Sequence, residues 1–114
     1  MIVYFGFAIA DSMFNGDCTI KRESLTIDQA REIINKGVKP CINPAHEATI
    51  RAMEKRYGIE VQIPEKAAHI FLNPGDQLLI MSARGLPRLD TPREYSDDEI
   101  AKASFSFSLY SVHN

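Results

Sequence analysis

The chain has 114 residues, of which 45% are hydrophobic and 25% charged, a composition typical of a globular protein with one core. Its net charge of −2 gives no general attraction to long nucleic acid or to an anionic membrane, so an anionic ligand would need local positive charge. No apolar run is long enough to cross a bilayer, and the first residues lack the basic region of a signal peptide. Cys18 and Cys41 form neither a disulfide framework nor a metal motif, so we expect a reduced, cytoplasmic protein.

The first third of the chain predicts two strands and a helix. Residues 2–9 are β-branched and aromatic on both faces, which favours a central strand, and residues 18–22 could form a short edge strand. A helix should follow from Thr26, which forms a capping box with Gln29, and it should end at Gly37.

The longest helical pattern begins at Asn43, a suitable N-cap, with Pro44 in the first helical position, and it ends at Gly58. His46 falls in the first turn, close to unsatisfied N–H groups and the positive end of the helix dipole. A phosphate could bind there, with the histidine beside it to deliver a proton. Helical spacing places His46 on the side of Ile50, at the edge of the buried stripe. The alternative is a half-buried structural histidine at a capped helix.

The second half of the chain predicts four strands, at residues 59–63, 68–72, 77–83 and 104–112. The second and third should form a hairpin, because the Pro-Gly step at residues 73–76 is typical of a type II turn. A short helix should begin after Ser96, and the last strand has one apolar face and one serine face. The element order predicts a single α/β domain over residues 1–114, with a mixed sheet, two main helices and a short third helix.

The sequence contains neither a G-x-G-x-x-G loop nor the Walker pattern for binding phosphate. It also lacks a serine nucleophile in a G-x-S-x-G motif and the spacing of metal ligands. What remains is His46 and an arginine-rich loop in the last third of the chain. Guanidinium groups can donate two parallel hydrogen bonds to a phosphate, and nearby carboxylates can orient them or polarise a hydroxyl. The loop residues suited to these roles are Arg84, Arg88, Asp90, Arg93 and Glu94. The alternative is a solvated loop with surface ion pairs that contribute little stability.

Three stretches in this order carry a resemblance. Residues 45–49 read A-H-E-A-T, where the family pattern is G-H-[DE]-[SA]-T; residues 75–79 read G-D-Q-L-L after a tight turn; and Arg88-Leu89 precedes the acidic Asp90. Over nearly its whole length the chain resembles the viral anti-CRISPR ring nucleases, small α/β proteins of archaeal viruses with bacterial and phage relatives.

The resemblance implies a homodimer that binds a cyclic oligoadenylate, with cyclic tetra-adenylate as the first candidate, across its two-fold axis. This ring is the second messenger of type III CRISPR defence. In the family the ribose 2′-OH attacks its own phosphate without a metal or other cofactor, which leaves 2′,3′-cyclic phosphate ends. The family's general acid falls on His46, its arginine on Arg88 with Arg84 as rival, and its glutamate on Glu94 with Asp90 as alternative. If the protein is viral, its place is the host cytoplasm.

Ligand-binding positions follow from the same alignment. Relatives carry Asn and Ser side chains just after the first strand, where this chain has Phe7, Ala10 and Ser12. The ligand-binding candidates are therefore Asp11, Ser12, Glu47, Thr49, Arg84 and Asp90. Two of the three polar positions are lost, which favours a dimer that binds the ring without cutting it more than the resemblance alone would. A third possibility is a protein–protein interaction module that keeps only the fold.

Overall fold

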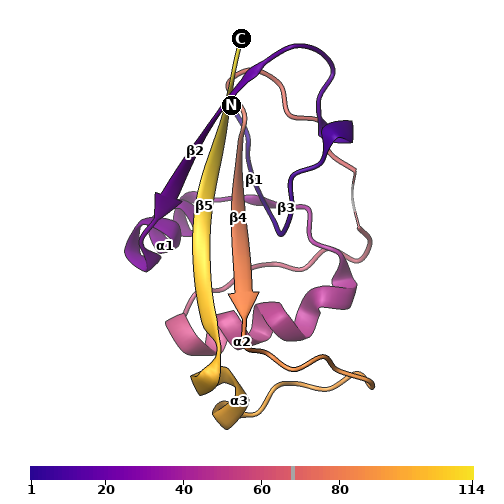
Figure 1. The fold of residues 1–114 in the computed structure, drawn as a ribbon, viewed down its shortest axis with the longest axis vertical. Coiled ribbons are helices and arrows are strands. Elements are labelled where there is room, and N and C mark those ends of the chain that lie inside the picture. The colour runs from indigo at the N-terminus through magenta and orange to yellow at the C-terminus, as the bar shows by residue number, and fades with distance from the viewer. Residues whose placement is uncertain (68) are drawn as a thin grey trace.

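The computed structural model describes residues 1–67 and 69–114. Its strands are β1 (Val3–Gly6), β2 (Thr19–Leu25), β3 (Lys39–Pro40), β4 (Gln77–Arg84) and β5 (Ser104–His113). Its helices are α1 (Ile27–Lys36), α2 (Glu47–Tyr57) and α3 (Asp97–Lys102), with 3₁₀ turns η1 (Asp11–Met13) and η2 (Pro44–His46). The five strands form one mixed sheet (Figure 1), so the predicted class of a mixed sheet with two main helices and a short third is confirmed.

The strand order is β2-β5-β4-β1-β3, with β1 parallel to both of its neighbours and β5 antiparallel to both of its own. The prediction of a central first strand is confirmed, although β1 is shorter than expected. Because β1, β3 and β4 run in the same direction, their carboxyl ends meet at one edge of the sheet. Ligands of α/β sheets commonly bind at such an edge, where the chain passes to either side of a central strand.

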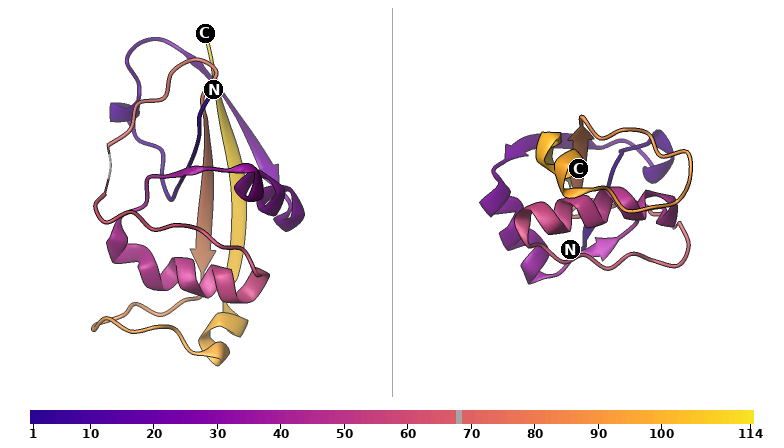
Figure 2. Two further views of the ribbon diagram at one scale, coloured as in Figure 1. Left: turned by 180° about the vertical axis from the view of Figure 1, so that it is seen from behind. Right: turned by 90° about the horizontal axis from the view of Figure 1, so that it is seen from below.

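Both main helices pack on one face of the sheet, as Figure 2 shows from behind. α1 contributes Ala30 and Ile34, and α2 contributes Ile50 and Met53, to a core around the fully buried Phe5. Full burial of one such large apolar side chain contributes roughly 1.5–3 kcal/mol. This layer fixes the start of α2 next to the carboxyl ends of the parallel strands.

The opposite face of the sheet is covered by irregular chain over β1 and the first half of β4. Leu72 N–H donates to the carbonyl of Met13 over 2.7 Å, and Ile70 and Leu72 are buried against this face. The predicted strand at 68–72 is therefore wrong for residues 69–72, and residue 68 lies outside the described residues. Both edges of β4 already pair with β1 and β5, so no hairpin partner can be added. The predicted turn does form, since Asp76 N–H donates to the Asn73 carbonyl over 2.9 Å.

The strand predicted at residues 59–63 is also wrong, because this segment is irregular. Ile59 and Val61 are buried in the same core as the apolar residues of α2, which explains their alternation with exposed residues. The Val61 N–H donates to the Glu54 carboxylate over 2.8 Å instead of to a neighbouring strand. A period of two therefore reflects burial here and not strand pairing.

The residues predicted to cap α1 and to end α1 and α2 are confirmed. Thr26 and Gln29 exchange the two hydrogen bonds of a capping box at α1, and Gly37 and Gly58 follow α1 and α2 with positive φ. The second helix differs from its prediction at its start. Asn43 caps the turn η2, accepting a hydrogen bond from Ala45 N–H, and the α-helix itself begins at Glu47.

The two-faced nature of the last strand is confirmed. Phe107 of β5 is buried in the core, as are its same-face neighbours in the strand, while Ser104 and Ser106 are exposed on the other face. On that serine face Arg22 of β2 donates to the hydroxyls of Tyr110 and Ser108. On this face the sheet thus presents an exposed polar surface along β2, at the start of β5 and at the end of β4.

Candidate functional site

A cavity of about 430 Å³ lies at the edge where the parallel strands end. Phe7 contributes from the residue after β1, Ser82 from β4, His46 and Thr49 from η2 and α2, and Arg88 from the loop after β4. Figure 1 shows that loop passing below α2 before it reaches α3. The candidate acid His46, the hydroxyl of Thr49 and one candidate arginine, Arg88, are therefore brought together from segments far apart in the chain.

His46 is the last residue of η2, immediately before α2. It is exposed, so its predicted place at the edge of the buried stripe is wrong. The reason is local: a 3₁₀ turn winds more tightly than an α-helix, so the helical spacing from Ile50 does not extend back to it. The His46 ring packs edge to face on Phe7, with centroids 5.1 Å apart at 78°. This ring contact and the adjacent helix N-terminus set its orientation and electrostatic surroundings.

The three arginines of the loop region differ in how they are held. The Nη1 and Nη2 groups of Arg93 donate hydrogen bonds to the two oxygens of the Glu99 carboxylate, at 2.8 and 2.9 Å. Arg88 is exposed and makes no hydrogen bond or ion pair with any residue in ranges 1–67 and 69–114. Arg84 ends β4 opposite Ser104, and strand alternation places it on the serine face of the sheet. Of these, Arg88 is the cation at the cavity with free donors.

The Arg93–Glu99 pair predicts a specific response to acid. The Arg93 hydrogen bonds, and then the Ser96 N–H, lower the pKa of Glu99 from 4.5 to about 2. A carboxyl group with a lowered folded-state pKa stabilises the fold above its unfolded pKa and loses that contribution as the pH falls toward the folded value. We expect the Glu99→Gln variant to lose this part of the acid dependence between about pH 4.5 and 2. Urea unfolding across this range checks it, and parallel pH curves for variant and wild type would contradict it.

Three carboxylates predicted at the site lie on a neighbouring cavity of about 730 Å³ instead. Glu47, Asp90 and Glu94 line this cavity together with Arg51 and Arg93. Glu94 also lies 3.4 Å from the Lys55 ammonium. The loop after β4 lines both cavities, but Glu94 lies on this one and Arg88 on the other, so the structure does not bring Glu94 together with His46 and Arg88 in one cavity.

The polar residues after β1 lie elsewhere. Asp11 and Ser12 are exposed on η1 and do not line the cavity that holds His46. After Phe7 the chain turns back toward the end of the sheet where the N-terminus lies, away from α2 (Figure 1). Met13 then joins the cover of the opposite face. Phe7 is thus the residue after β1 that lines the cavity. In the sequence, only its alignment with a polar position of the ring-nuclease family pointed to it.

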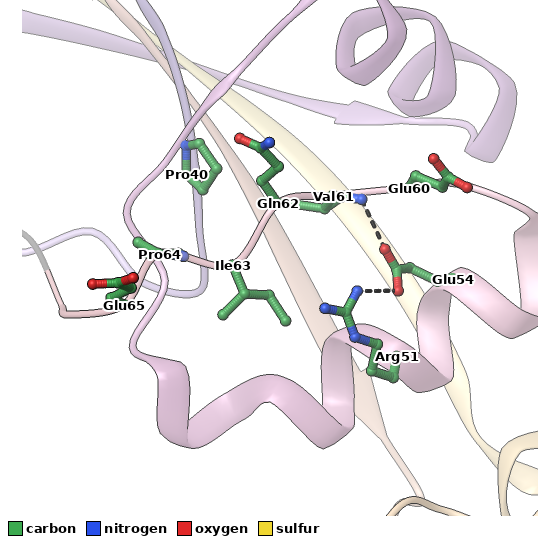
Figure 3. A pocket seen from close by; sticks show the side chains of 9 residues that line it. All are labelled: Pro40, Arg51, Glu54, Glu60, Val61, Gln62, Ile63, Pro64 and Glu65. Atoms are coloured by element: carbon green, nitrogen blue, oxygen red, sulfur yellow. Dashed lines mark hydrogen bonds and ion pairs between the residues drawn. The ribbon is translucent and has the colours of Figure 1, made fainter.

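A larger cavity of about 780 Å³ lies between α2 and residues 59–65 (Figure 3). Its lining includes Glu54, Glu60 and Glu65. Its one arginine, Arg51, is paired with Glu54, which also accepts the Val61 N–H. Carboxylates repel a phosphate, and the paired guanidinium leaves little positive charge to offset them. Despite its size, this cavity has the wrong chemistry for an anionic ligand.

Within residues 1–67 and 69–114, no group of three or more His, Cys, Asp or Glu side chains could hold a metal ion. Cys18 and Cys41 are free thiols, and burial raises the pKa of Cys41. None of the helices in the described ranges has the length and apolar character needed to cross a bilayer.

Comparison with known proteins identifies a family and a similar structure for this chain. A family model described as STIV B116-like matches residues 6–107, nearly the whole chain and all of the site. The chain belongs to the STIV B116-like family. It is also similar in structure to B116 of Sulfolobus turreted icosahedral virus, with a TM-score of 0.67 and 21% identity over 97% of this chain and 99% of that one. At this identity the likeness concerns the fold. A search of curated proteins found no match.

Proposed function

We propose that this STIV B116-like protein binds a cyclic oligoadenylate and cleaves it without a metal. The first candidate ligand is cyclic tetra-adenylate. The observation that carries the proposal is the cavity that joins His46, Thr49 and Arg88 at the carboxyl ends of parallel strands. Among the described residues, no side chain pairs with the Arg88 guanidinium. The resemblance to the viral ring nucleases, with A-H-E-A-T at residues 45–49, suggests the ligand.

The proposed reaction needs few protein groups. The ribose 2′-OH loses its proton to a water molecule as it attacks the adjacent phosphorus, and the bond to the 5′-oxygen breaks. The products carry a 2′,3′-cyclic phosphate and a 5′-hydroxyl. His46 gives its proton to the leaving 5′-oxygen, and Arg88 donates to the phosphate oxygens as negative charge develops. Because nucleophile and phosphate belong to one molecule, alignment supplies much of the remaining acceleration.

The second candidate is binding without cleavage. It is favoured by Phe7, whose apolar ring contacts His46 where relatives carry a polar side chain. A labelled panel of cyclic nucleotides, incubated in EDTA, separates the candidates. Cleavage supports the ring nuclease, binding of an intact ring supports the sequestering protein, and no interaction supports a protein–protein interaction module.

We propose a homodimer as the binding form. A cavity of about 430 Å³ is smaller than a ring of four nucleotides needs, so a symmetric ring suits two cavities related by a two-fold axis. The exposed serine face at the start of β5 is a polar surface that a second copy could cover. Light scattering at micromolar concentration should give twice the 12.8 kDa mass of the chain. A mass near 12.8 kDa alone would contradict the dimer.

Arg88 should contribute more to ligand binding than Arg93. Arg88 lines the cavity and has no hydrogen-bond partner in the described part of the chain. Arg93, in contrast, is paired with Glu99 and lies 5.8 Å over the Tyr95 ring. We expect Arg88→Ala to weaken binding of cyclic tetra-adenylate by about tenfold or more, because a charge-assisted bond contributes about 1.5–3 kcal/mol. Arg93→Ala should weaken it less. Titration calorimetry measures both, and an equal or larger loss at Arg93 would count against this assignment.

A further inference from the structure

We propose that Tyr95 is a positioning residue that holds the Arg88 segment at the rim of the cavity, and so sets the affinity for the ligand's phosphate. This inference rests on the proposed function for its ligand. It concerns a residue for which neither the sequence motifs nor the family resemblance suggested a role. Tyr95 lines the same cavity as His46 and Arg88.

The hydroxyl of Tyr95 donates to the carbonyl of Pro87 over 2.9 Å. Pro87 directly precedes Arg88, so this bond fixes the backbone from which the arginine side chain extends. The proline ring further restricts the chain at that point, because its φ is fixed near −65°. Arg88 itself makes no bond within the described residues that would hold it, so its position depends on this backbone anchor.

Tyr95 can act as an anchor because it is itself fixed. Its side chain is only 8% exposed and belongs to the main core, with Leu86 and Leu89 of the loop packed against that core. On the solvent side the Arg93 guanidinium lies 5.8 Å over its ring and is held by Glu99 of α3. The loop is therefore packed on the core on both sides of Arg88, and after Arg88 it is also tied to α3.

The hydroxyl can be separated from the ring. A phenylalanine would fill the same space in the core, so Tyr95→Phe removes the bond to Pro87 and little else. If the hydroxyl acts through Arg88, its loss should matter only while Arg88 is present. Tyr57→Phe is the matched control, because Tyr57 ends α2 at the opposite end from His46 and packs on Phe105.

The test is a double-mutant cycle on binding of cyclic tetra-adenylate, with backbone order parameters measured by NMR on the free proteins. Tyr95→Phe should weaken binding by roughly five- to tenfold, the equivalent of one hydrogen bond, and should add nothing to Arg88→Ala. The order parameters of Arg88 and Leu89 should fall in Tyr95→Phe and stay unchanged in Tyr57→Phe.

Two results would overturn the inference: unchanged order parameters at Arg88 in Tyr95→Phe, or additive losses in the double variant. A wild-type protein that binds no cyclic oligoadenylate would overturn the proposed function instead. In that event the order parameters, which need no ligand, still decide whether the Tyr95 hydroxyl holds the Arg88 segment.

Discussion

Replacing His46 by alanine should slow cleavage of cyclic tetra-adenylate by about 10² to 10⁴ while leaving binding nearly intact. A general acid acts in the transition state, so its loss appears in the chemical step and not in the affinity. Stability should change little, because His46 is exposed and its side chain accepts no capping hydrogen bond. The Asn43 cap on η2 stays in place.

His69→Ala is a matched control for this variant. His69 is also exposed and also packs edge to face on a phenylalanine, Phe71, with centroids 4.8 Å apart. Both variants therefore lose a similar ring contact, but only one removes the proposed acid. Single-turnover cleavage and a thermal melt should be measured on the same preparations. A folded His46→Ala protein with wild-type cleavage would remove His46 from the mechanism, and an unfolded one would assign it a structural role.

Replacing Asp76 by alanine should lower the free energy of unfolding by about 2–4 kcal/mol, since hydrogen bonds to charged groups contribute roughly 1.5–3 kcal/mol each. Asp76 is buried, and its carboxylate accepts the N–H groups of Ile2 and Asn73, at 3.1 and 3.0 Å. It thereby ties the start of the chain, just before β1, to the turn before β4. Its loss would leave two amides without their partner.

Urea unfolding measures this cost, and the exposed Asp17 offers the control. Asp17→Ala should change the free energy of unfolding by less than about 0.5 kcal/mol, as is usual for an exposed residue. An equal, small effect at Asp76 would contradict its anchoring role. The expected difference also gives the G-D pair at residues 75–76 a structural explanation, because Gly75 takes a φ of 94° in the turn that Asp76 closes.

Much of the fold could be predicted because its signals are local. The capping box at Thr26 involves two side chains three residues apart and forms as predicted. The short helix predicted after Ser96 begins with a second such box. The apolar and serine faces of β5 follow from a period of two, with the apolar face packed on the core. In these segments the backbone and its nearest neighbours decide the conformation.

The wrongly predicted strands lie where strand pairing depends on residues far away in the sequence. Residues 59–63 and 69–72 alternate like strands, but their alternation reflects burial of Val61, Ile70 and Leu72 and not a ladder. Whether an alternating segment pairs depends on which strand edges are free, and β1 and β5 occupy both edges of β4. No local pattern contains that information.

Some residues of the candidate site could likewise be placed from the sequence, and others could not. His46 and Arg88 meet because one follows β3 and the other follows β4, two parallel strands whose ends lie at one edge of the sheet. The placements of Asp11 and Glu94 depend on the paths of irregular segments after β1 and β4, which sequence patterns do not fix. Tyr95 was missed because a buried aromatic residue in a loop gives no functional signal until its hydrogen-bond partner is known.

The most direct test of the ring-nuclease proposal is to incubate radiolabelled cyclic tetra-adenylate with an excess of the wild-type protein in EDTA. The products are then compared with end-labelled standards. We expect linear products that carry 2′,3′-cyclic phosphate ends, formed at the same rate with and without the chelator. A ring recovered intact after prolonged incubation, or cleavage that stops in EDTA, would contradict metal-independent cleavage at the cavity of His46 and Arg88.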